Sequence, residues 1–159
     1  MLIGVKDKKK IMATTTATIN IASSDLLTDS LSLSSTTTLY QHGTTATGLD
    51  ECNYHRANIP TGTNFVLISE SAALNTSGAN YVYIVNKNTD VTDYVIISIK
   101  DEVIGRLYAG DWMFFPWDSD VVALDGNDSA VEAQAYTHEV ILEYCLFHNG
   151  ETRPTSDDS

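Results

Sequence analysis

Residues 81–117 read YVYIVNKNTDVTDYVIISIKDEVIGRLYAGDWMFFPW, and this stretch decides the fold class. Runs of β-branched and aromatic residues, which favour strands, are separated by short Asn, Asp and Gly segments, which favour turns. The pattern predicts strands over 81–85, 94–99, 103–107 and 112–117. Strands at this spacing are typical of an antiparallel sandwich or jelly roll.

The same pattern extends to both sides of this stretch. Further strands are predicted over 65–68, 121–124, 131–136 and 139–147, the last apolar enough to be central. The Ser/Thr-rich region before residue 49 alternates at 18–22 and 31–34, which predicts half-buried strands with one apolar face. Residues 49–62 are predicted to be irregular. Without an amphipathic helix of useful length, the fold class is all-β, an antiparallel, jelly-roll-like β-sandwich.

Composition divides the chain into three parts. Residues 1–12 form a basic N-terminal arm that contains Lys6, Lys8, Lys9 and Lys10. Residues 13–148 form a single β-sandwich domain, and residues 149–159 form an acidic polar tail. Met12 is followed by a small residue, so residues 1–11 are either a genuine arm or an upstream mis-start.

Charge restricts the partners of this protein. The formal net charge is −12. Because such a surface repels phosphate, no nucleic-acid partner is expected, whereas a basic protein would suit it. No stretch reaches the length of a membrane span, and the first residues lack a secretion signal, so we expect no membrane partner and synthesis in the cytoplasm.

Cysteine and histidine give no metal signature. Burial trends predict that Cys145 is a free thiol in an apolar strand, and a bridge to Cys52 stays open. The four histidines are His42, His55, His138 and His148, and none has zinc-site spacing. Cys52 and His55 lie three residues apart, but without a second half-site they are expected to be ordinary loop residues.

No catalytic motif is present. The acidic pairs Asp118/Asp120 and Asp125/Asp128 lie in predicted turns and lack the ligand run of a calcium loop. There is no nucleophile elbow, P-loop or dinucleotide fingerprint, although a pair of glycosidase carboxylates would leave no such signature. We therefore expect a non-enzymatic protein with no catalytic residues, cofactor or metal.

The segment 112–117 is apolar on both faces. Alternation places Trp112, Phe114 and Pro116 on one side, and Met113, Phe115 and Trp117 on the other. One face is expected to enter the core. The other either also fills the core or is covered by a neighbouring subunit.

Several of these stretches together resemble small virion structural proteins of tailed bacteriophages. The resemblance extends over most of residues 12–148, and it is carried by residues 24–31 (SDLLTDSL), 83–88, 94–97, 104–117 and 142–144.

This resemblance implies a β-sandwich capsid cement or decoration protein on the capsid exterior of a virion. It also implies binding to the major capsid protein and homo-oligomerisation, with a trimer favoured. A tail component (fibre, nozzle or adaptor module) is one alternative. Another is a carbohydrate-binding module that uses Trp112, Trp117 or Tyr108 as sugar-stacking platforms.

Overall fold

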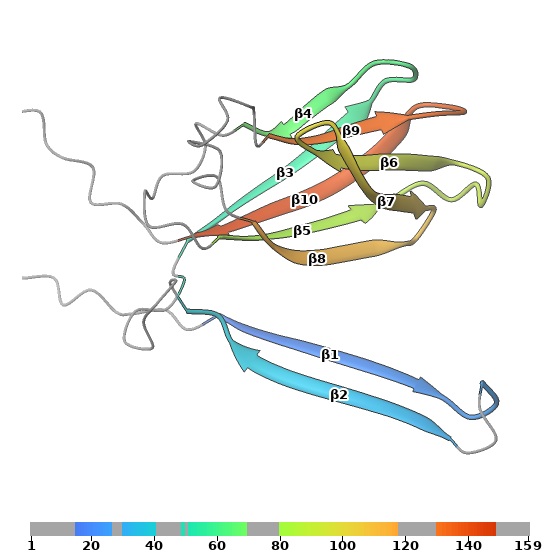
Figure 1. Ribbon diagram of the computed structural model, residues 1–159. Helices are drawn as coiled ribbons and strands as arrows, with labels where there is room; N and C mark the ends of the chain where they lie inside the picture. Colours follow the sequence, from blue (N-terminus) through green and yellow to red (C-terminus); the bar gives the residue numbers. More distant parts are fainter. Residues whose placement is uncertain are drawn as a thin grey trace, which may run out of the picture.

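The structure is a computed structural model that describes residues 15–26, 30–40, 49, 51–69, 80–117 and 130–148 (Figure 1). The predicted arm, the predicted tail, the predicted strand 121–124, the two acidic pairs and His42 lie outside these residues. The described chain forms the strands β1 Thr16–Ser23, β2 Leu31–Thr38, β3 Glu51–Ile59, β4 Phe65–Ile68, β5 Asn80–Asn86, β6 Tyr94–Ile99, β7 Glu102–Tyr108, β8 Trp112–Trp117, β9 Val131–Ala135 and β10 Val140–His148.

Strands β3 to β10 form a two-layered body. One sheet has the order β3-β10-β5-β8, the other has the order β4-β9-β6-β7, and neighbouring strands are antiparallel. The first strand of the body is therefore paired with its last strand, and the second with the second-to-last, as in a jelly roll. The predicted all-β, jelly-roll-like sandwich is confirmed.

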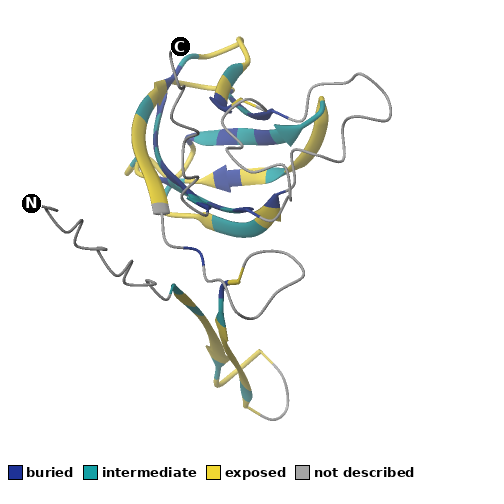
Figure 2. Ribbon diagram, turned by 90° about the vertical axis from the view of Figure 1, so that its left-hand side faces the viewer, coloured by how far each residue is buried: buried dark blue, intermediate teal, exposed yellow. Residues whose placement is uncertain are grey.

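The core lies between the two sheets, and side-chain alternation determines which residues enter it. In β5, Val82 and Ile84 are fully buried, whereas Tyr81 and Tyr83 point to the other side and are half-buried. The central strand β10 buries Val140, Leu142 and Leu146 in the same way. Figure 2 shows that the buried positions are concentrated in the two-sheet body, whereas β1 and β2 are mostly exposed.

The predicted irregular region 49–62 is corrected by the structure, because most of it is strand β3. This strand lies at the edge of its sheet and pairs only with β10 among the described strands. Its outward positions include Arg56 and Asn58, and its inward positions include Asn53 and His55. Polar residues on both faces hide the two-residue period that reveals the other strands.

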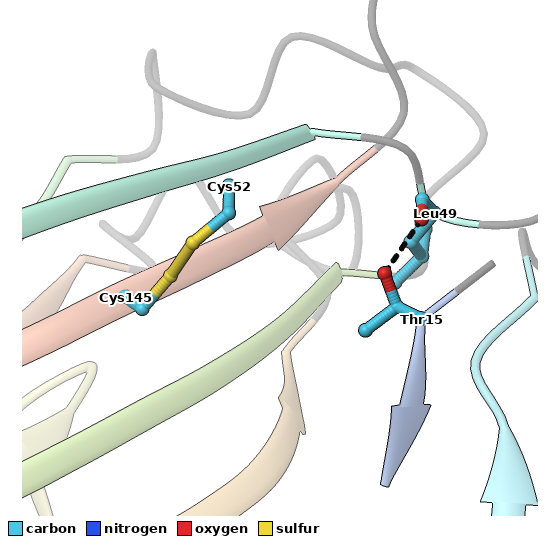
Figure 3. Close-up of a disulfide and its surroundings, with 4 residues drawn as sticks. All are labelled: Thr15, Leu49, Cys52 and Cys145. Atoms are coloured by element: carbon cyan, nitrogen blue, oxygen red, sulfur yellow. Dashed lines mark hydrogen bonds between the residues drawn. A yellow bond between two sulfur atoms is a disulfide. The ribbon is translucent and has the colours of Figure 1, made fainter. Parts of the chain in front are cut away.

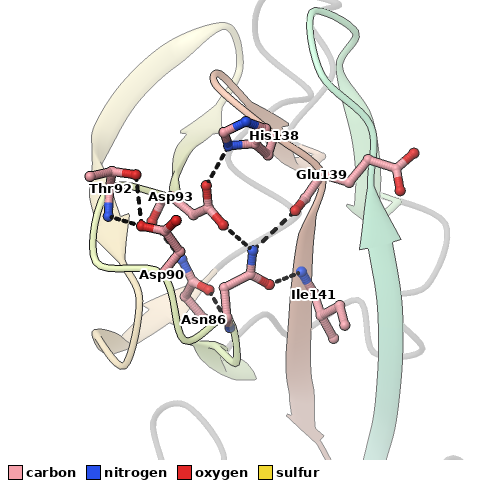
Figure 4. Close-up of polar contacts among 8 residues, drawn as sticks. Asn86, Asp90, Thr92, Asp93, His138, Glu139 and Ile141 are labelled. Carbon is pink, nitrogen blue, oxygen red and sulfur yellow. Dashed lines mark hydrogen bonds and ion pairs between the residues drawn. The ribbon is translucent and has the colours of Figure 1, made fainter.

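Amide side chains join two turns at one end of the body (Figure 4). The Asn88 amide donates to Asp93 Oδ2 at 2.8 Å and to the Glu139 carbonyl at 3.0 Å, and it accepts the Ile141 N–H at 2.9 Å. Asp93 Oδ1 lies 2.8 Å from His138 Nδ1. The turn after β5 is thus fastened to the turn before β10.

Asp90 is expected to make this end of the body sensitive to acid. The backbone N–H and then the hydroxyl of Thr92 hydrogen-bond to its carboxylate and lower its pKa below the ordinary 3.8. A lowered folded-state pKa gives stability that is present above the unfolded-state value and is lost as pH falls through the folded-state value. We therefore expect Asp90→Asn to flatten the acid limb of the stability profile below pH about 4, measured by denaturant unfolding.

Asp101→Asn is the matched control, because Asp101 is also an exposed turn aspartate. An acid limb that both substitutions flatten equally would contradict the assignment to Asp90.

Candidate interaction surfaces

Strands β1 and β2 form a hairpin that extends from the body (Figures 1 and 2). Its register places Ile19 opposite Ser35 and Ile21 opposite Leu33. We call the side that carries these residues the ribbon face, and its apolar members are Ala17, Ile19, Ile21, Leu31 and Leu33. The opposite side carries Ser, Thr and Asn with Ala22, and on it the Thr18 and Thr36 hydroxyls lie 3.0 Å apart.

Three of the five apolar residues of the ribbon face are exposed, and the other two are half-buried. Ile19, Ile21 and Leu33 are 41%, 52% and 53% exposed. The two strands were predicted correctly, but their predicted half-burial is wrong, because no second layer covers the hairpin within the described residues. Since a two-stranded hairpin alone is marginally stable in water, this face is a candidate contact surface.

The root of the hairpin is held firmly (Figure 3). Thr15 Oγ1 donates to the Leu49 carbonyl at 2.9 Å, and the Leu39 N–H donates to the Thr15 carbonyl at 2.9 Å. The Leu49 N–H donates to the Leu39 carbonyl at 3.1 Å, and both leucine side chains are buried. These bonds tie both strands of the hairpin to Leu49, two residues before β3 begins.

The outer side of sheet β3-β10-β5-β8 is aromatic. We call Tyr81, Tyr83, Trp112, Phe114 and Phe147 the aromatic face. Tyr81 stacks on Phe114 at 5.4 Å between ring centroids, and Phe147 meets Phe114 edge-on at 6.3 Å. Trp112 is 54% exposed. The predicted alternation of segment 112–117 is confirmed, since Met113, Phe115 and Trp117 pack in or against the core.

A cleft of about 280 Å³ lies where the hairpin root meets the aromatic face. Thr15 to Ile19 and Leu39 line one side, and Tyr83, Trp112, Phe114 and Phe147 line the other. Ile21, Leu31 and Leu33 are not part of its lining. The outer half of the ribbon face is therefore separated from the chain's own aromatic face.

A disulfide joins Cys52 on β3 to Cys145 on β10 (Figure 3). Cys145 is therefore not the free thiol that burial predicted. The register explains the pairing, because Cys52 lies opposite Phe147 and thus diagonally across from Cys145 on the same side of the sheet. Residues 93 apart in sequence become neighbours only through this register, which composition does not reveal.

Cys52 and His55 do not form a metal half-site. Three residues apart on a strand, they point to opposite faces, and His55 instead stacks on Tyr144 at 5.3 Å between ring centroids. Burial raises the pKa of the Tyr144 phenol. Among the described residues, no group of three or more His, Cys, Asp or Glu is arranged to hold a metal ion.

A second aromatic cluster lies on the outer side of sheet β4-β9-β6-β7. The Tyr94 ring lies 5.3 Å from Tyr108 and 5.4 Å from Tyr136, and the Arg106 guanidinium lies 5.1 Å from its centroid. We call these four residues the tyrosine face. Of these four residues only Tyr108 was a candidate from the sequence, because β6, β7 and β9 must pair in register before the four residues meet.

The remaining sequence candidates are dispersed. Trp112 and Trp117 lie on opposite sides of β8, with Trp117 buried, and Tyr108 belongs to the other sheet. These three residues cannot form one sugar-stacking platform. His138 fastens a turn through Asp93, and His148 is buried at the end of β10.

The sequence matches no protein-family model and no curated protein. Among the described residues, no helix has the length and apolar character needed to cross a membrane.

Proposed function

We propose that this protein is a non-catalytic structural component of a bacteriophage virion, a cement or decoration protein on the outside of the head. In this role it binds the major capsid protein as a homo-oligomer, with a trimer favoured, and stabilises contacts between capsid subunits. It is synthesised in the host cytoplasm and acts on the capsid exterior.

The uncovered ribbon face carries this proposal. An amphipathic hairpin that a jelly-roll body holds away from itself requires a neighbour, which suits a component of an assembly. Jelly rolls occur in viral capsid proteins and in lectins, so the fold is compatible with the proposal but does not select it. The capsid assignment itself rests on the sequence resemblance.

The disulfide supports the exterior location. Disulfides persist on virion surfaces and in other oxidising environments, whereas they are rare in the cytosol. A Cys52–Cys145 bridge would then form after release from the host cell and would strengthen the body where the particle is exposed.

The tyrosine face is the proposed contact with the major capsid protein. Tyrosine and arginine are enriched among the residues that dominate binding energy at protein interfaces. Tyr136 is 66% exposed and therefore available to a partner. The net charge of the protein is −12, and Arg106 places a positive charge on the tyrosine face. This charge lessens electrostatic repulsion between the tyrosine face and an acidic partner surface.

The direct test is binding to purified expanded capsids of the cognate phage, read out by co-sedimentation and by the temperature at which capsids disrupt. We expect the wild-type protein to bind and to raise that temperature. Tyr136→Ser is expected to weaken binding by about tenfold or more, because it removes the most exposed ring of the tyrosine face.

Val91→Ser is the control, since Val91 is 77% exposed but lies in the turn between β5 and β6. Failure of the wild-type protein to bind either expanded or unexpanded capsids would exclude the decoration role. Binding to purified tails instead would favour the tail-component alternative.

Carbohydrate binding is the second candidate, and the tyrosine face is the observation that favours it. Three neighbouring tyrosine rings with an adjacent arginine are able to stack on a sugar and to hydrogen-bond its hydroxyls. Retention on a glycan array that is lost in Tyr136→Ser, without binding to capsids, would favour this function.

A further inference from the structure

We infer that the hairpin of one copy packs its ribbon face on the aromatic face of a second copy. This inference specifies the oligomer interface within the proposed function, and it does not depend on capsid binding. It joins the largely exposed ribbon face to the aromatic face, which is half-buried apart from the exposed Trp112.

The absence of charge on the hairpin favours a second copy as the occupant. The strands TATINIAS and LSLSSTTT contain no ionisable residue, although the whole chain carries a net charge of −12. Two acidic bodies repel each other, but an uncharged hairpin approaches an acidic neighbour without that cost. On the receiving sheet, Glu143 lies within 3.8 Å of Arg56 and 3.7 Å of Lys87, so its charge is offset.

The dimensions of the two surfaces also agree. Each hairpin strand has eight residues and is roughly 26 Å long, and the nine residues of β10 span roughly 30 Å. One hairpin is therefore long enough to cover most of the receiving sheet. Its apolar side chains meet aromatic rings, of which Trp112 is the most exposed.

The root of the hairpin favours exchange between copies over closure on its own sheet. The Thr15, Leu39 and Leu49 hydrogen bonds hold the hairpin strands and the segment before β3 together at the root. The outer half of the ribbon face does not line the chain's own cleft and is therefore open to the sheet of another copy. A hairpin of one copy on the sheet of the next is a heterologous contact, which closes into a ring when the rotation permits. Such a ring would produce the proposed trimer.

Sedimentation of the full-length protein tests this interface. Ile21 and Leu33 face each other across the ladder, so the double substitution Ile21→Thr/Leu33→Thr makes the ribbon face polar while keeping residues that suit strands. We expect the wild-type protein to be an oligomer and this variant to sediment near the 17.4 kDa of one chain. Losing two half-exposed apolar contacts is expected to raise the dissociation constant by about 100-fold.

The matched control is Asn20→Thr/Ser34→Thr, the adjacent cross-strand pair on the opposite side of the same hairpin. This control should remain an oligomer. Neither pair contributes to the core of the body, so both variants should keep the thermal transition of the body. A lost transition would identify unfolding rather than dissociation.

A complementation experiment establishes which surface receives the hairpin. Trp112→Thr/Phe114→Thr alters the aromatic face and should also give monomers, while the emission of buried Trp117 reports an intact core. Mixed with the ribbon-face variant, it should form a complex with one copy of each. That complex retains one intact hairpin and one intact receiving sheet.

Each other outcome overturns the inference. A wild-type protein that is monomeric at every concentration means that the hairpin closes on its own body. Dissociation by the ribbon-face variant alone, without an effect of the aromatic-face variant, means that hairpins pair with hairpins. An unchanged oligomer with lost capsid binding means that the capsid protein covers the ribbon face, and that result leaves the proposed function standing.

Discussion

Reduction of the Cys52–Cys145 disulfide is expected to lower the free energy of unfolding by about 4 kcal/mol. The bridge closes a loop between residues 93 apart, and the loss of chain entropy that such a loop imposes on the unfolded state is of this size. It also links β3, an edge strand with polar residues on both faces, to the central strand β10. Denaturant unfolding with and without reductant, with thiol titration, measures the effect.

The variant Cys52→Ala/Cys145→Ala is the control, and reductant should leave its stability unchanged. The wild-type protein is either released from a virion or oxidised after purification, and its thiols are titrated without reductant. Two reactive thiols per chain would show that the bridge does not form. Equal stability of reduced and oxidised protein would show that the crosslink contributes nothing.

The substitution Asn86→Ala is expected to destabilise the protein by about 3 kcal/mol. Asn86 is buried, and its amide donates to the Leu107 carbonyl at 3.0 Å and to the Asp93 carbonyl at 3.4 Å. The side-chain oxygen Oδ1 of Asn86 accepts the Asn88 backbone N–H at 2.9 Å. Because truncation leaves buried polar groups without a partner, the cost includes their desolvation as well as the lost hydrogen bonds. Denaturant unfolding of the variant measures this cost.

Asn58→Ala is the matched control. Asn58 also makes a side-chain hydrogen bond, to Glu139 Oε2 at 2.8 Å, but both groups are exposed to water. Its loss should cost less than about 1 kcal/mol. If the two variants lose similar amounts of unfolding free energy, the buried Asn86 amide does not contribute more to stability than an exposed one.

Runs of β-branched and aromatic residues between turn-forming segments allowed most of the fold to be predicted from the sequence. Segments 65–68, 94–99 and 112–117 coincide with β4, β6 and β8, because such runs favour strands that are buried in a sandwich. Strand β3 did not follow from the sequence. It pairs through its backbone at a sheet edge, and its outward side chains are free to be polar.

The interaction surfaces were only partly predictable. The alternation of β8 already separated Trp112 from Trp117, and the apolar period of the hairpin strands was visible. The disulfide and the tyrosine face depend on which strands pair and in which register, and these long-range choices have no local signature. The exposure of the ribbon face was missed for a related reason, since alternation shows that a face is apolar but not that the chain covers it.

The pairing of β3 with β10 also bears on engineering. The first and last strands of the body, β3 and β10, are adjacent, and a disulfide joins them. The hairpin precedes β3 in the chain, and its root is formed by Thr15, Leu39 and Leu49. We therefore expect the hairpin to be exchangeable. Replacing it with another amphipathic hairpin would change which surface the protein binds and would leave the fold of the jelly-roll body unchanged.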